Sequence, residues 1–128
     1  MENNSSSDSN DRFAIESLVK ENLAYFQYWK EVQLEDKTMP WRGTELKLVS
    51  GIPPNKLSND DPEIIKEYIL PVNMTQYKEE FITLQCLDLV FENLCEKDTK
   101  RIILGIVNSD GTLVFYFIYK GIHKPKKN

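Results

Sequence analysis

The stretch RIILGIVNSDGTLVFYFIY, residues 101–119, decides the fold because it predicts two strands joined by a tight turn. Apolar side chains occupy both alternating faces of each strand, so neither strand has a polar face. We therefore expect both faces of this hairpin to be covered. The turn Asn108-Ser109-Asp110-Gly111 suits a type I turn closed by a glycine in the left-handed region, with Asp110 at the tip.

The second strand of this hairpin is the last regular element that the sequence predicts. Its hairpin mate takes one edge, and only an earlier strand or another molecule is left for the other. An apolar strand of seven residues, about 23 Å long, is an aggregation hazard when one edge stays open, and no proline or lysine interrupts it. We predict that a partner chain docks along this strand, which comprises Leu113, Val114, Phe115, Tyr116, Phe117, Ile118 and Tyr119.

The upstream sequence predicts a surface helix over residues 11–29, short strands near 32–34 and 46–49, and a strand over 67–72. A long helix over residues 74–95, capped by Asn73, is apolar nearly all round, which predicts burial between layers or against another chain. It connects the strand before it to the first hairpin strand as a parallel, right-handed βαβ unit. The predicted order is αβββαββ, an α/β domain with a mixed sheet packed by a surface helix and a long buried helix.

Length and composition fit one soluble domain: 128 residues, 15.0 kDa, 41% hydrophobic and 28% charged. No apolar run approaches 18 residues and no signal-peptide pattern occurs, so neither a membrane span nor secretion is indicated. We divide the chain into a disordered tail over residues 1–10, a folded domain over 11–122 and a basic tail over 123–128.

The net charge of −4 argues against a protein whose whole surface grips nucleic acid, but the basic residues gather at the C-terminal end. Two interpretations of this end stay open: phosphate contacts with RNA, or a solubilising end. The candidate RNA-binding residues are Lys120, His123, Lys124, Lys126 and Lys127.

The sequence does not predict a self-sufficient enzyme. Its single histidine, His123, lies in the tail, away from any predicted pocket, and no nucleotide-binding or nucleophile motif occurs. Cys86 and Cys95 are predicted small core residues in a reducing compartment, too far apart along one helix for a disulfide. Two cysteines and one histidine do not build an ordinary zinc site, and we expect no metal or cofactor. The enzymatic alternative is a small nuclease built on His123, Lys100 and a tyrosine.

Four segments carry a family resemblance: ENLAYFQYWKEV, PPNKLSND, ILPVNMTQYKEEFITLQCL, and the hairpin LGIVNSDGTLVFYFIYKG with its KPKKN ending. In order and spacing they resemble the smallest, non-catalytic subunits of fungal tRNA-splicing endonuclease, over nearly everything after residue 11. The resemblance implies a fold like the catalytic domain of tRNA-intron endonucleases. Catalytic members use a tyrosine, a histidine and a lysine, with the histidine ahead of the long helix. Here Lys100 or Arg101 stands near that lysine, but residues 67–73 hold no histidine, so no catalytic residue is assigned.

The resemblance also implies how the hairpin is used. The last strand pairs with its counterpart in a catalytic subunit of a heterotetramer, and an acidic loop inserts into a basic pocket on another subunit, with Asp110 the nearest equivalent. The whole complex cleaves precursor tRNA at exon–intron boundaries by attack of a 2′-hydroxyl, leaving a cyclic phosphate and a 5′-hydroxyl. The implied compartment is the nucleus, the cytoplasm or the cytosolic surface of the mitochondrial outer membrane. The main alternative is a homodimeric RNA-binding module that uses the same strand and the basic tail.

Overall fold

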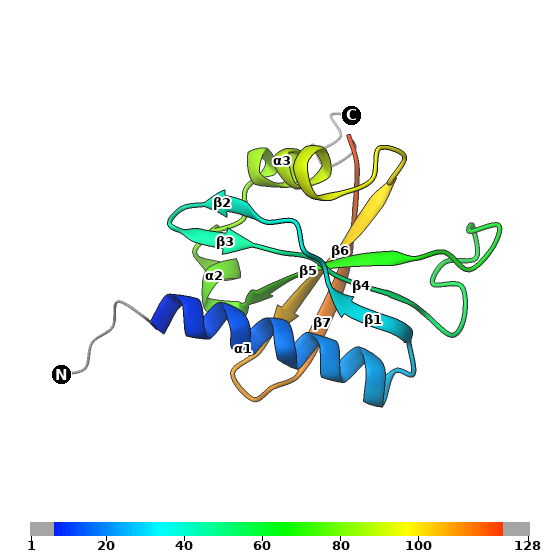
Figure 1. Cartoon of the computed structure of the whole chain (residues 1–128), viewed down its shortest axis with the longest axis horizontal. Coiled ribbons are helices and arrows are strands. Elements are labelled where there is room, and N and C mark those ends of the chain that lie inside the picture. Colours follow the sequence, from blue (N-terminus) through cyan, green and yellow to red (C-terminus); the bar gives the residue numbers. More distant parts are fainter. Residues whose placement is uncertain (1–6, 122–128) are drawn as a thin grey trace.

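The computed structural model describes residues 7–121 and centres on a five-stranded sheet (Figure 1). The strand order across this sheet is β1-β4-β5-β6-β7. The bounds of these strands are β1 (Lys30–Leu34), β4 (Val49–Ile52), β5 (Glu67–Asn73), β6 (Arg101–Val107) and β7 (Leu113–Tyr119).

The sheet is mixed, as the sequence predicts. β5 and β6 run parallel, in a register that places Ile69 beside Ile103, and the other neighbouring strands pair antiparallel. All seven residues of β6 are buried, as are the first six of β5. The two apolar segments on either side of the predicted long helix therefore form the centre of the fold.

Helices cover the two faces of the sheet in separate layers. One face packs on α1 (Ser7–Glu21), which continues into a π-helical turn, η1 (Asn22–Phe26), and buries Val19, Leu23 and Ile103. The other face packs on α3 (Leu84–Leu94), together with a small sheet of β2 (Met39–Trp41) and β3 (Thr44–Leu46). Figure 1 shows α1 and α3 at opposite sides of the molecule with the sheet between them.

The predicted long helix is not continuous. It divides into α2 (Met74–Lys78) and α3, with Glu80 between them at a positive φ of 58°. The Thr83 side chain caps the new helix by accepting a hydrogen bond from the backbone N–H of Cys86 at 3.1 Å. The carbonyls freed by the break are satisfied from β2 and its turn, because the Trp41 indole donates to Phe81 (2.6 Å) and Arg42 donates to Glu80 (3.2 Å).

Other boundaries differ from the predicted ones. α1 begins at Ser7, not near residue 11. The β2–β3 hairpin, with Gly43 in its turn at φ 82°, begins inside the predicted turn region 36–43 and extends past it to Leu46. The strand predicted near 46–49 is displaced, because β3 ends at Leu46 and β4 begins only at Val49. The predicted capping box at Asn73 is confirmed, with Gln76 as its second member. The order αβββαββ is therefore wrong in two places, an additional hairpin and a divided helix, although the five strands of the main sheet occur in the predicted sequence order. Among the described residues, no helix is both long and apolar enough to cross a membrane.

Candidate partner-binding edge

β7 lies at one edge of the main sheet and, within residues 7–121, pairs only with β6. Their antiparallel register is unbroken from the pair Arg101–Tyr119 to the pair Val107–Leu113. No earlier strand in the described part of the chain occupies the other side of β7. The strand is therefore an uninterrupted, mostly apolar edge of the kind that invites pairing with another chain.

The hydrogen bonds at the two ends of the hairpin fix which backbone groups face outward. Lys120 donates its N–H to the carbonyl of Lys100 at 2.9 Å, and Asn108 donates to the carbonyl of Thr112 at 2.8 Å. Because hydrogen-bonded and non-bonded pairs alternate in an antiparallel ladder, residues 114, 116 and 118 bond to β6. The free edge is presented by the N–H and C=O groups of Leu113, Phe115, Phe117 and Tyr119.

The side chains of β7 are less covered than the sequence predicts. Tyr116, Phe117 and Tyr119 are 49%, 39% and 40% exposed, whereas every residue of β6 is buried. Leu113 and Phe115 pack toward the α1 face, and Val114 and Ile118 toward the α3 face. The expectation that both faces of the hairpin are covered is correct for β6 and wrong for β7, because the helices pack mainly on the central strands.

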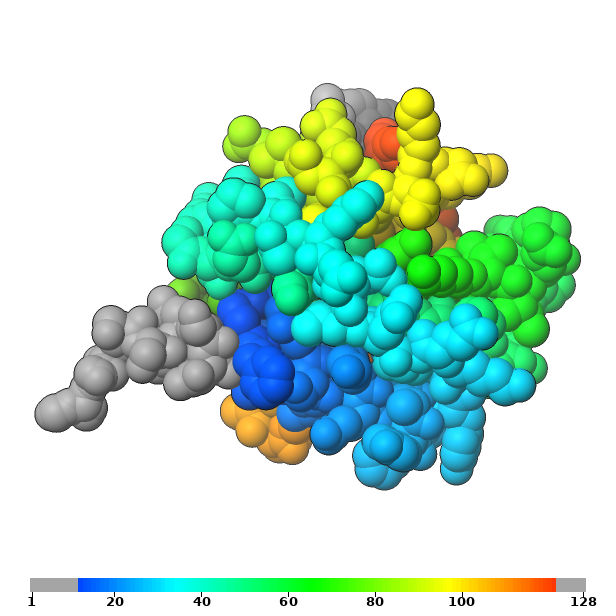
Figure 2. Space-filling model, viewed as in Figure 1, coloured from blue at the N-terminus to red at the C-terminus, as the bar shows by residue number. Residues whose placement is uncertain are grey.

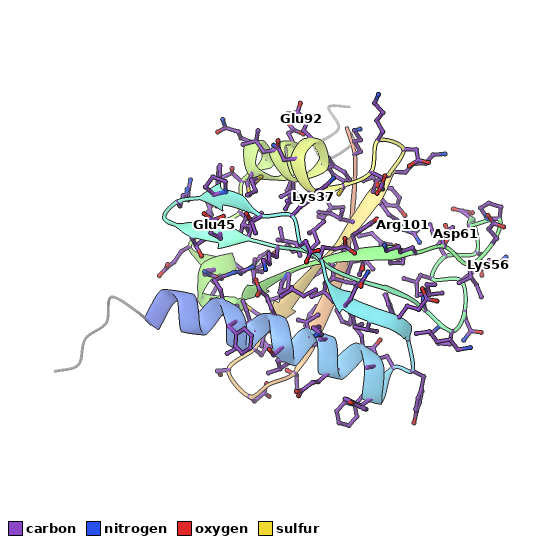
Figure 3. The ribbon with its side chains drawn as sticks, viewed as in Figure 1. Lys37, Glu45, Lys56, Asp61, Glu92 and Arg101 are labelled. Atoms are coloured by element: carbon purple, nitrogen blue, oxygen red, sulfur yellow. The ribbon has the colours of Figure 1, made fainter. Side chains whose placement is uncertain are left out.

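Arg101, the first residue of β6, ties this edge to the neighbouring strand and loop. Its guanidinium donates to both carboxylate oxygens of Glu67 in β5, and bidentately to Asp61 in the β4–β5 loop at 3.1 and 2.9 Å. It also lies 4.5 Å from the ring centre of Phe117. Figure 3 shows Arg101 and Asp61 on the same side of the molecule, close to this loop.

The electrostatics of this cluster follow from burial and pairing. Hydrogen bonding to Arg101 lowers the pKa of Asp61, and the two carboxylates raise the pKa of Arg101. Burial raises the pKa of Glu67, against the opposing effect of Arg101. Because both carboxylates already occupy the guanidinium, Arg101 is not available to bind a phosphate.

A cleft of about 500 Å³ borders this cluster. Lys100 and Tyr119 line it together with Lys66 and Tyr68, so the lysine and a tyrosine of the nuclease alternative share one site. The Lys66 ammonium lies 3.5 Å from the Glu35 carboxylate and 5.3 Å from the Tyr68 ring centre. His123, the third residue of that alternative, is outside the described residues.

In the turn between β6 and β7, hydrogen bonds from Thr112 orient the Asp110 carboxylate. Asp110 is exposed, and its carboxylate accepts hydrogen bonds from the backbone N–H (3.1 Å) and the hydroxyl (2.8 Å) of Thr112. These hydrogen bonds lower the pKa of Asp110. Gly111 closes the turn at a φ of 90°, which confirms the predicted left-handed glycine. The contact of Asp110 with a partner stays a prediction.

Comparisons with known proteins place the chain in a family. Residues 18–128 match the model of the family described as Sen15 protein. The chain belongs to the Sen15 family. A curated relative from Eremothecium gossypii, named tRNA-splicing endonuclease subunit SEN15, is 42% identical over 114 residues, covering 89% of this chain and 91% of the relative. A second, from Schizosaccharomyces pombe and named probable tRNA-splicing endonuclease subunit sen15, is 30% identical over 132 residues, covering 93% and 86%.

The family match confirms the resemblance found in the sequence, and the structure locates part of the predicted site. The seven residues of β7 form one continuous edge, and Lys120 follows it at an exposed position. The remaining candidate RNA-binding residues lie outside the described residues, namely His123, Lys124, Lys126 and Lys127.

Cys86 and Cys95 are buried free thiols whose pKa values burial raises to about 11. Residues 7–121 contain no cluster of three or more side chains that could hold a metal ion.

Some features of this Sen15 chain escape sequence reasoning. The Arg101 cluster joins residues 34 and 40 positions apart, and only the adjacency of β5 and β6 brings them together. Three aromatic side chains after the first helix also lie on the surface: Tyr25 and Tyr28 are both 72% exposed, beside Phe26 at 75%. Tyr25 and Phe26 lie in the π-helical turn η1, and Tyr28 follows that turn at a positive φ of 62°, two irregularities that the helical spacing of the sequence does not predict.

Proposed function

We propose that this chain is a non-catalytic structural subunit of tRNA-splicing endonuclease that positions a catalytic subunit by strand pairing through β7. Both curated relatives are named as subunits of that enzyme. The observation that carries the proposal is the open edge of β7, seven residues long, apolar and free of any irregularity. Main-chain hydrogen bonds to such an edge supply affinity, and side chains on the two faces supply specificity.

We place the cleavage chemistry in the partner chain. Among residues 7–121, the lining of the cleft that holds Lys100 and Tyr119 includes no histidine, and its buried cation, Arg101, is occupied by Glu67 and Asp61. The one histidine of the sequence, His123, follows the folded domain. These features support a subunit that shapes the endonuclease without completing an active site.

Two proline substitutions, one residue apart, test the pairing. Proline removes a backbone donor. Phe117→Pro removes an outward N–H and should abolish assembly with the other endonuclease subunits, with a small decrease in the melting temperature of the isolated chain. Tyr116→Pro, the matched control, removes an inward N–H from the β6–β7 ladder, so its main effect should be a lower melting temperature.

Size-exclusion chromatography with light scattering measures assembly, and thermal melts measure stability. Normal assembly of Phe117→Pro with the purified subunits contradicts pairing through β7. If the isolated wild type is a dimer that Phe117→Pro dissociates, and if that dimer persists in the presence of the other subunits, the homodimeric alternative is the better description.

We also infer that the basic C-terminal end contacts precursor tRNA within the complex. Lys97, Lys100 and Lys120 line one surface depression of about 480 Å³ where β7 ends, and the basic tail continues from there. Truncation after Gly121 removes three further lysines, and should lower the log–log salt slope of RNA binding by up to about three units while assembly is retained. An unchanged slope supports a purely solubilising end.

A further inference from the structure

We propose that the strand that pairs with β7 inserts a large apolar side chain into a groove on the α1 face of the sheet. Gln27, Trp29, Leu57, Ile103, Phe115 and Phe117 line this groove. Its volume is about 170 Å³, several times the roughly 30 Å³ share of a liquid water molecule. This inference rests on the proposed pairing through β7 and adds what the partner must carry.

The groove borders β7, the strand that carries the free edge. Phe115 and Phe117 present their backbone groups outward, and in the same strand their side chains line the groove. A strand added to this edge lies about 4.8 Å away. Residues directly opposite each other in an antiparallel pair have side chains on the same face, with Cβ atoms roughly 5 Å apart. The partner residues opposite Phe115 and Phe117 therefore lie on the same face of the sheet as the groove, next to two of its lining side chains.

The chemistry of the groove selects an apolar occupant. Ile103 is 2% exposed, Trp29 is 8% exposed, and Leu57 contributes a partly buried aliphatic side chain from the β4–β5 loop. The one polar side chain is Gln27, and its amide already donates to the Asn22 carboxamide oxygen at 2.6 Å. Gln27 keeps a second amide N–H and its carbonyl oxygen, but the other five lining side chains are hydrophobic. An apolar side chain therefore gains burial in the groove, whereas a charged one loses hydration and finds at most one neutral polar partner.

The occupant is a strand of another endonuclease subunit. The groove and the edge are continuous, since Phe115 and Phe117 belong to both. A second copy of this chain could present its own Phe115 or Phe117 in the same geometry, and the experiment below separates the two occupants.

A photocrosslinking pair identifies what fills the groove. Benzoylphenylalanine replaces Leu57 in the full-length chain, and the control carries it at Ile64, which is 45% exposed on the same loop and does not line the groove. Figure 2 shows this loop projecting at one end of the molecule. After assembly with the other subunits and irradiation, position 57 should crosslink to a strand of another subunit, and position 64 should not. A crosslink to β7 of a second copy, or none in an assembled complex, overturns the proposal.

Substitutions give the matching affinity test. Leu57→Glu should weaken assembly about ten-fold or more, whereas Ile64→Glu should change it less than about three-fold. Leu57→Ala, which adds no charge, should also weaken assembly. It replaces Leu57→Glu as the test if Leu57→Glu lowers the melting temperature of the isolated chain. Normal assembly of Phe117→Pro contradicts the pairing itself. Disruption by Phe117→Pro together with normal assembly of both Leu57 variants contradicts the groove alone.

Discussion

The two edges of the main sheet, β1 and β7, are built differently. β1 has five residues, carries Lys30 and Glu31 at exposed positions, and has a register irregularity between Lys30 and Gln33. β7 has seven residues, none charged, in unbroken register with β6. Short length, charge and bulges are the devices by which proteins keep an edge from pairing with another chain, and only β1 uses them.

This difference favours β7 over β1 as the proposed interaction edge, without reference to any partner. Both edges belong to the same sheet and the same folded domain, so a general tolerance of open edges does not explain why only one is protected. The apolar character of β7 also extends to side chains that are left partly exposed on both faces, among them Tyr116 and Phe117. The comparison therefore supports an edge of β7 that is completed by another chain.

The ion pairs near the two edges give the largest expected effect on stability. Near β7, Arg101→Met leaves Glu67, which is 2% exposed, without the guanidinium that neutralises it. Removing one partner of a buried pair costs several kcal/mol, and we expect about 3 kcal/mol here because the cluster borders the cleft. For a domain of this size, that loss lowers the melting temperature by roughly 10 °C.

Near β1, Lys66→Met is the matched control. It removes an ion pair with Glu35 in which the lysine side chain is 44% exposed. An exposed pair contributes less than about 1 kcal/mol, so the melting temperature should hardly change. The melting temperatures of both variants are measured on the isolated chain. Equal decreases for Arg101→Met and Lys66→Met contradict the view that the Arg101 cluster stabilises the fold more than the Lys66–Glu35 pair.

The pH dependence of stability sharpens the same contrast. Arg101 lowers the pKa of Asp61 below its unfolded value, so this carboxylate stabilises the fold above the unfolded pKa of about 4 and loses that effect as the pH falls through the folded pKa. Asp61→Asn should therefore lower the melting temperature at pH 7 and flatten its decline below about pH 4. Asp60→Asn, at the exposed neighbouring position, is the control. If the melting temperature of Asp61→Asn falls as steeply below about pH 4 as that of the wild type, Asp61 does not have this role.

The sequence predicts the central part of this fold well, for physical reasons. The segments that became β5, β6 and β7 are apolar at nearly every position, and such runs bounded by turn residues have few alternatives to a strand. The open edge of β7 is also predictable, because β7 is the last strand that the sequence predicts and its hairpin mate occupies one side. The divided helix does not follow, because the break depends on Trp41 and Arg42 reaching the carbonyls of Phe81 and Glu80 from a distant hairpin.

The candidate site is likewise predictable only in part from the sequence. Which residues lie on the free edge is visible in the sequence, but which of their backbone groups point outward requires the register, set by the bonds of Lys120 and Asn108. The groove beside that edge is also inaccessible from sequence. Its walls come from Trp29, Leu57 and Ile103, three segments that only the tertiary fold assembles.

The smallest expected effect concerns the protected edge. Glu31 adopts a φ of 54° at the irregularity of β1, a left-handed conformation that costs a residue other than glycine about 1–2 kcal/mol. Glu31→Gly removes that strain but adds chain entropy to the unfolded state, so we expect a net gain in the free energy of unfolding of at most about 1 kcal/mol. Assembly with the endonuclease subunits should not change, because the proposed pairing edge is β7. Glu31→Ala, which keeps the Cβ atom, should not stabilise the chain. A Glu31→Gly variant that assembles less well, measured by light scattering beside the wild type, would show that β1 also belongs to an interface and would remove the distinction between the two edges.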